Sequence, residues 1–407
     1  MLRGGFGVFY DLASSEVGSL LHNGGYPFSA LNQESGPYPL TPTAAAPPAI
    51  TSASLANCCN ALVGFDPHLR LPYTLQWNVA IEQGLGAQQS ISASYIGSSG
   101  KRLLQTGYVS SPTPNLYAAM LVGNTATSDY NAMQIQFQRH LSAGLQVLAS
   151  YTWSHSIDDG SAGSSYVSSN AFIPSEISAN RGPSDFDIRN SFSAGITYEI
   201  ATRGTSVLRK AVLGGWSVQS FVLAHSSPPV DVSDQNFLEF NDRFNVDVRP
   251  DLVPGQPLHL YGAQCAATFQ ALGELSPGFS CPGGTGFNPA AFTNPPTDPL
   301  TGNPLRQGDA PRNFLRGFSV AQWDFSVHRT FPIHDSVTLQ FRAEMFNLLN
   351  HPNFGPPSGQ FGSGGFGLSS QTLGQSLNAG NLGGGGLDPL YQIGGPRSIQ
   401  FALKLTF

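Results

Sequence analysis

A stretch rich in aspartate contains the side chains of this sequence that could bind a metal ion. Its members are Asp231, Asp234, Asp242, Asp247 and Asp251. Ca²⁺ prefers carboxylate oxygens, which makes the first three of these aspartates candidate calcium ligands, although their spacing matches no EF-hand loop. His155 with Asp158 and Asp159 forms another candidate metal group, for which a solvated loop is the favoured interpretation. We therefore predict that the chain holds neither a metal ion nor another cofactor.

A second acidic motif, DFDIR, spans residues 185–189. Asp185, Asp187 and Arg189 are better explained by ion pairs that fix a loop at the rim of a larger structure than by acid–base chemistry. The sequence contains no GxSxG nucleophile elbow, no HExxH motif and no phosphate-binding loop. We predict no catalytic residues, and hence a protein that is not an enzyme.

The four cysteines show neither CxxC spacing nor a zinc pattern. Cys58 and Cys59 are adjacent, which is poor geometry for a bond between them. Cys265 and Cys281 lie in a turn-rich segment and could form a disulfide in an oxidising compartment, provided that their Cα atoms come within about 7 Å.

The composition excludes several classes of protein. Only 11 % of the 407 residues are charged, against roughly 25 % in soluble domains. The 19 basic and 25 acidic residues give no electrostatic footprint for nucleic acid, and the apolar runs are too short for a transmembrane helix. The chain begins Met1-Leu2-Arg3 and continues directly as GGFGVFY, without a signal peptide. This beginning predicts a fragment of a longer protein.

A period of two organises the chain. Between Tyr73 and Ile81 the odd positions are apolar or aromatic, whereas the even positions are mostly polar and uncharged. Such alternation is typical of half-buried strands. Ten strands are predicted, at residues 3–10, 72–83, 89–98, 130–140, 144–156, 189–201, 213–226, 319–332, 336–349 and 396–407.

The connections between these strands alternate in length. Short ones are expected at 84–88, 141–143, 202–212 and 333–335, and long ones at 11–71, 99–129, 157–188, 227–318 and 350–395. An outer-membrane barrel has short turns at its periplasmic end and long loops at its extracellular end. The sequence therefore predicts an all-β, antiparallel, up-and-down transmembrane barrel in the cell outer membrane. Outer-membrane lipid is an expected partner of this barrel.

The same alternation predicts which side chains face lipid and which face the lumen. The convex, lipid-facing side should carry Trp77, Phe137, Tyr198 and Phe341, and the concave side Gln76, Gln136, Thr197 and Gln340. Aromatic girdles at the membrane interfaces would use Tyr73, Trp77, Tyr95, Tyr151, Trp153, Tyr198, Trp216 and Trp323. A soluble β-sandwich with the same alternation is the alternative architecture.

Several motifs together resemble one family. They are RGGFGVFYD from Arg3, YTLQWNVAIE from Tyr73, YIGS from Tyr95, NRGPSDFD from Asn180, GGW from Gly214, FNPAAF from Phe287, RAEMFN from Arg342 and NHP from Asn350, with the last strand ending at Phe407. In this order they resemble the C-terminal barrel half of Oar-like TonB-dependent outer-membrane transporters of Gram-negative bacteria. The resemblance covers nearly the whole chain, residues 1–407.

The resemblance implies a barrel of about 22 strands, of which these ten would be the last. It also implies energised uptake or export of a bulky substrate, which the sequence does not identify. The TonB contact and the plug would belong to an N-terminal region that is not found in this chain. A surface-exposed structural or adhesive protein without transport, and a soluble secreted protein that binds carbohydrate, are the alternatives.

Three further expectations concern the loops and the C-terminus. Residues 227–318 should form an extracellular loop with a small β-ribbon of its own, and Phe361–Gly386 should be the least ordered segment. Phe407 continues an apolar face formed by Ile399, Phe401, Leu403 and Leu405. It resembles the terminal aromatic by which the barrel assembly machinery recognises its substrates, through pairing at a strand edge.

Overall fold

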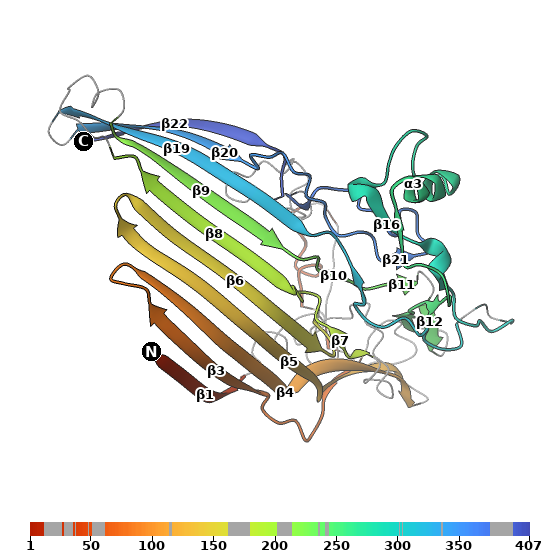
Figure 1. Cartoon of the computed structure of the whole chain (residues 1–407). Coiled ribbons are helices and arrows are strands. Elements are labelled where there is room, and N and C mark those ends of the chain that lie inside the picture. The colour runs from red at the N-terminus through yellow and green to blue at the C-terminus, as the bar shows by residue number, and fades with distance from the viewer. Residues whose placement is uncertain are drawn as a thin grey trace.

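Ten strands form one large antiparallel sheet in the computed structural model (Figure 1). The structure describes residues 1–11, 27, 36, 38–47, 49–50, 62–113, 116–161, 180–201, 214–234, 237–240, 244–300, 302, 304–334, 337–374 and 394–407. The strands are β1 (Leu2–Tyr10), β3 (Tyr73–Gly84), β4 (Gln89–Thr113), β5 (Leu116–Ser142), β6 (Leu145–Asp158), β8 (Asn190–Glu199), β9 (Trp216–His225), β19 (Val320–His334), β20 (Val337–Phe346) and β22 (Ser398–Thr406). Each pairs with its neighbours in chain order, so the predicted up-and-down sheet of ten strands is confirmed.

The two ends of the sheet differ. The strands are joined by short connections at one end, where both chain termini also lie, and the long connections gather at the other end (Figure 1). Among the described residues, no helix has the length and apolar character needed to cross a membrane.

The connection expected at 99–129 is mostly strand, so this prediction was wrong. β4 and β5 continue past the expected boundaries and pair as far as Thr113 and Leu116. Register shifts interrupt their pairing between Gly100 and Leu103 and again between Leu103 and Gln105. Shifts of this kind disrupt the period of two, which is why the alternation did not reveal the extension.

Two short strands pair with the large sheet outside its main order. β2 (Leu62–Phe65) runs parallel to β5, opposite residues 119–122, and β7 (Gly182–Pro183) is antiparallel to the end of β6. The expectation of an entirely antiparallel sheet was therefore wrong for β2. β2 pairs with residues 119–122, in the part of β5 that extends beyond the predicted strand. A connecting segment can pair there in a parallel or an antiparallel direction, because it is not a neighbour of β5 in the up-and-down order.

The cross-strand register gives the sheet one apolar and one polar face. Val147, Ile196, Ser220, Phe325, Met345 and Ile399 are successive partners on one face. One residue along, the partners on the other face are Gln146, Thr197, Gln219, Ser326, Glu344 and Gln400. The predicted sets follow this division. The apolar face carries Trp77, Phe137, Tyr198 and Phe341, and the polar face carries Gln76, Gln136, Thr197 and Gln340.

A glycine opposite a tryptophan shows how closely the apolar face is packed. Trp77 on β3 lies directly across from Gly97 on β4. A Cβ atom on Gly97 would be 2.2 Å from the Trp77 ring. The indole therefore covers a backbone that only glycine leaves accessible, an arrangement that pins the register of neighbouring strands.

The connection from 227 to 318 is a folded unit rather than an open loop. We call it, together with residues 354–372, the loop lobe. It contains α3 (Gly262–Ala271) and the short strands β10 (Pro229–Val230), β11 (Ser233–Asp234), β12 (Phe237–Phe240), β13 (Phe244–Asp247), β14 (Asp251–Leu252), β15 (His259–Tyr261), β16 (Thr285–Phe287), β17 (Phe292–Thr293), β18 (Leu315–Arg316) and β21 (Gln360–Phe361). Two 3-10 turns, η2 (Pro282–Gly284) and η3 (Pro289–Ala291), complete it. β12 and β13 form the small ribbon that the sequence predicts.

The lobe core joins two connections that are distant in the sequence. Phe292 packs against Phe361 and Phe366, with ring centroids 5.8 and 5.4 Å apart. β21 also pairs in parallel with β11. The expectation that Phe361–Gly386 is the least ordered segment was therefore wrong for residues 361–374, and residues 375–386 lie outside the described residues. Phenylalanines among glycines gain order here because a partner core from the 227–318 connection buries them.

Candidate functional site: the polar face and its rim

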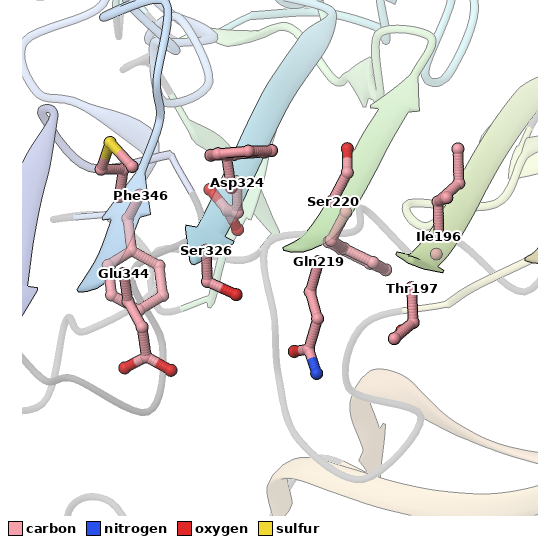
Figure 2. A pocket seen from close by; sticks show the side chains of 12 residues that line it. Ile196, Thr197, Gln219, Ser220, Asp324, Ser326, Glu344 and Phe346 are labelled. Carbon is pink, nitrogen blue, oxygen red and sulfur yellow. The ribbon is translucent and has the colours of Figure 1, made fainter. Parts of the chain in front are cut away.

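Hydroxyl, carboxamide and carboxylate groups form a continuous polar surface on the sheet. A hollow of about 360 Å³ lies on it, lined by Thr197, Gln219, Ser326 and Glu344 from four successive strands. Phe221 and Phe346 line the same hollow and interrupt the polar groups on this face. In Figure 2 the side chains of Thr197, Gln219 and Glu344 extend in the same direction, and Ile196 points the opposite way. Such a surface offers hydrogen bonds to water or to polar cargo, as the inner wall of a water-filled barrel must.

The rim of this surface, at its long-loop end, is held by a buried arginine. Arg312 is 1 % exposed. Its Nη1 donates to Oδ1 of Asp158 at 2.6 Å, and its Nη2 donates to Oδ1 of Asp185 at 3.1 Å and to the Ser161 hydroxyl at 2.9 Å. A buried guanidinium needs paired charges and hydrogen bonds to be stable, and here both Nη groups supply them whereas Nε is buried without a hydrogen-bond partner. Arg312 therefore fastens the loop lobe to β6 and to the DFDIR segment.

A second buried junction surrounds Asp187. Its carboxylate accepts hydrogen bonds from Nη2 of Arg316 at 2.7 Å and from the Ser156 amide at 2.9 Å, and it lies 3.2 Å from Nδ1 of His155. The Nε of Arg189 is 3.1 Å away. Burial alone would raise the pKa of Asp187, but these donors outweigh it and hold the pKa below its usual value. The carboxylate thus stays ionised in the neutral range and ties β6, the DFDIR segment and the lobe together.

The DFDIR motif therefore forms the rim ion pairs that the sequence suggested. The sequence analysis did not identify the arginines that pair with this motif, Arg312 and Arg316. One sequence signal could have indicated them, because two arginines four residues apart in RNFLR flank apolar residues in an otherwise turn-rich loop.

The candidate metal ligands are occupied by other partners. Asp158 binds Arg312, and Asp159 lies 3.5 Å from Nη1 of Arg181. Both aspartates are buried, so the solvated-loop interpretation was wrong. Burial follows because the lobe covers the end of β6.

The aspartate stretch is likewise dispersed. Oδ1 of Asp231 accepts a hydrogen bond from the backbone amide of Asn313 at 3.1 Å and lies 3.7 Å from Nε of Arg249. Asp234 is buried on β11, and Asp242 lies outside the described residues. Within the described ranges, no three His, Cys, Asp or Glu side chains come together as a metal site would require.

A disulfide joins Cys265 and Cys281 in the lobe, with Cα atoms 6.1 Å apart, inside the limit set from the sequence. Both cysteines are buried in a small core with Leu260, Phe269 and Leu368. The bond closes the segment between α3 and η2 and stabilises this small core, which is separate from the larger apolar core around Phe292.

The aromatic residues proposed for the membrane interfaces share the apolar face. By register this face carries Tyr73, Trp77, Tyr95, Tyr151, Trp153, Tyr198, Trp216 and Trp323. Tyr198 and Trp216 lie at the short-turn end, and Tyr73 begins β3 at the long-loop end. Phe407 follows the last residue of β22 and is 92 % exposed. Its role as an assembly signal stays a prediction.

Comparisons with known proteins place the chain in a family. The family model described as "Outer membrane beta barrel domain" matches residues 1–381. No curated protein sequence matches the chain at a significant level.

Three solved structures show a remote likeness. The outer membrane transporter YddB from Escherichia coli is 9 % identical, with a TM-score of 0.43 over 84 % of this chain and 33 % of that one. The copper transporter OprC is 9 % identical, with a TM-score of 0.33 over 75 % and 30 %. FpvA of P. aeruginosa, solved with heterologous pyoverdines, is 10 % identical, with a TM-score of 0.35 over 83 % and 28 %. The chain thus spans about a third of the length of these structures. Because the family model matches most of its length, this chain belongs to the outer membrane β-barrel domain family and resides in the outer membrane.

Proposed function

We propose that this chain forms part of the wall of a TonB-dependent outer-membrane transporter, with its polar face lining the lumen and the loop lobe at the outer mouth. One observation carries the proposal: the polar face continues across ten strands of a sheet whose two edges stay open. Within the described residues, no strand pairs with the outer edge of β1 or of β22.

Open edges cannot persist in hydrocarbon, where every backbone amide and carbonyl needs a protein partner. Further strands must therefore close the sheet. A closed barrel of about 22 strands, the number that the resemblance implies, encloses a lumen wide enough for bulky cargo or for a plug. The resemblance of the RGGFGVFYD, NRGPSDFD and RAEMFN motifs to Oar-like transporters supports the same interpretation. In that case the plug and the TonB contact belong to the remainder of the protein, and the transported substrate is unknown.

The rim supports a transporter because it fixes the lobe at the mouth of the lumen. Arg312 binds Asp158 at the end of β6, and Arg316 binds Asp187 in the β6–β8 connection, so the lobe is attached to the wall at two points where the carboxylate is buried. A lobe held in this way stays where arriving cargo must pass.

Site-directed labelling of the whole outer-membrane protein that contains this chain tests the proposal. In a background with serine at Cys58 and Cys59, cysteine is introduced at Gln219 on the polar face or at Ile196 on the apolar face. A membrane-impermeant maleimide should modify the first position and not the second.

A second measurement tests whether transport is driven by the proton-motive force. Collapse of the proton-motive force with a protonophore should change the labelling rate of Gln219→Cys, because TonB-driven movement of a plug alters access to the wall. Labelling at Gln219→Cys that ignores the protonophore would favour the structural or adhesive alternative. Equal labelling at both positions would refute the assignment of the lumen face itself.

A further inference from the structure

Two phenylalanines stand on the polar face of the sheet. Phe221 on β9 lies opposite Gly195 on β8 and Asp324 on β19. Phe346 on β20 lies opposite Ser398 on β22. Phe221 is 44 % exposed. An apolar ring that faces a water-filled lumen loses the stabilisation that burial would give it, so a ring kept at such a position points to contact with a ligand.

Both rings line the hollow of about 360 Å³, a volume within the usual range for sites that bind small organic molecules. β19 separates the strands that carry them, so their backbones are about 10 Å apart, twice the spacing of neighbouring strands. Gly195 leaves open space beside Phe221, because a Cβ atom there would meet nothing within 4 Å. Polar side chains accompany the rings on the same three strands, namely Gln219, Asp324 and Glu344 (Figure 2).

The carboxylates of the hollow are held in defined positions. Oδ1 of Asp324 accepts hydrogen bonds from the backbone amide of Asn347 at 2.8 Å and from Nε2 of Gln322 at 2.9 Å. A carboxylate has about four acceptor positions, so Asp324 can accept further hydrogen bonds from a ligand. Glu344 is paired with Arg342, whereas in the part of the chain that the structure describes no lysine or arginine pairs with Asp324. The hollow therefore favours a ligand that donates hydrogen bonds and carries no negative charge.

We propose that this hollow binds a pyranose ring of a neutral oligosaccharide. The inference rests on the proposed function, because it names the class of cargo that the lumen would carry. The C–H groups on one face of a pyranose are attracted by the electron-rich face of an aromatic ring. Its hydroxyl groups lie around the edge, where they can donate to carboxylates and exchange hydrogen bonds with carboxamides. The Asp324 carboxylate repels an anionic cargo.

Calorimetric titration of the whole outer-membrane protein in a non-ionic detergent tests the proposal. The probes are maltohexaose, cellohexaose and xylohexaose, with hexagalacturonate as the anionic probe and hexalysine as the peptide probe. At least one neutral hexasaccharide should bind. Phe221→Ala and Phe346→Ala should each weaken that binding about 10-fold, and Phe221→Tyr, which keeps the ring, should retain it. The control Phe192→Ala removes a ring that is 37 % exposed on the apolar face, and it should match the wild type.

Protection from maleimide labelling separates this inference from the proposed function. The hexasaccharide should slow the labelling of Gln219→Cys in the hollow. It should not slow the labelling of Ser92→Cys, which lies on the polar face of β4 opposite Gln136. If Gln219→Cys is labelled but no hexasaccharide protects it, the carbohydrate site is overturned and the lumen assignment stands. Failure of Gln219→Cys to be labelled would refute the proposed function, and this inference with it.

Three results of the titration would also overturn the carbohydrate site. They are the absence of binding by every neutral hexasaccharide, equal binding by the wild type and Phe221→Ala, and tighter binding of hexagalacturonate or hexalysine than of the neutral probes. Circular dichroism of each variant verifies that the sheet has formed.

Discussion

Replacement of Arg312 by methionine should release the loop lobe from the wall of the barrel. The substitution keeps most of the volume but leaves Asp158 buried without the charge that faces it at 2.6 Å. Removal of one partner from a buried ion pair typically costs 3–5 kcal/mol. We expect this cost in the opening of the lobe rather than in the unfolding of the sheet, because the broken contacts join the lobe to β6.

Native-state hydrogen exchange measures this opening. The Gly308 and Ala310 amides donate to the carbonyls of Arg249 and Pro250 within the lobe, close to Arg312. A loss of 3 kcal/mol or more should accelerate their exchange by about 100-fold or more. Amides in the centre of β8 should not change.

The lobe offers a matched control in Arg306→Met. Arg306 forms an equally short, two-pronged pair with Asp251, but its side chain is 51 % exposed. Water replaces such a pair at little cost, so this variant should exchange almost like the wild type. Similar acceleration in both variants would refute the argument, because burial would then not decide the strength of these ion pairs.

Four other predictions follow from the same structure. Cys265→Ala should lower the stability of the lobe by about 3 kcal/mol, since the disulfide joins cysteines 16 residues apart in the sequence. Limited proteolysis with and without reductant measures the loss, and a wild type whose cleavage is insensitive to reductant would contradict it. Gly97→Ala should reduce the amount of assembled barrel in the membrane, because its Cβ would clash with an indole, whereas Gly195→Ala, with open space at its Cβ, should assemble normally. Lowering the pH below about 4 should progressively loosen the lobe, because the folded-state pKa of Asp187 is depressed: its contribution is present above the unfolded pKa of about 3.9 and is lost as the pH falls through the folded value. Protection factors of the lobe amides, that is, exchange rates divided by the intrinsic rate at each pH, measure this loss, and protection factors that stay the same from pH 7 down to pH 2 would disprove it. Deletion of Phe407 should reduce membrane insertion at unchanged synthesis, and normal surface display of the deletion variant would show that the residue is only a terminus.

The sequence alone determined the strands and their faces. The alternation around Trp77 and Gln76 predicts the strand and the division between its two faces, because neighbouring side chains of an extended backbone point to opposite sides. A membrane strengthens this signal, since each strand separates lipid from a polar lumen along its whole length. The strands could therefore be located from local pattern without knowledge of their partners.

Only the tertiary structure decided what happens beyond the membrane. Arg312 and Asp158 are 154 residues apart in the sequence, and Phe292 meets Phe366 across two different connections. No periodicity encodes such pairs, because each depends on where the ends of the strands bring separate loops together. The extension of β4 and β5 escaped prediction for a related reason. Outside the bilayer nothing forces the side chains to alternate, so hydrogen bonding between the two backbones, rather than a pattern of residue types, determines how far those strands extend.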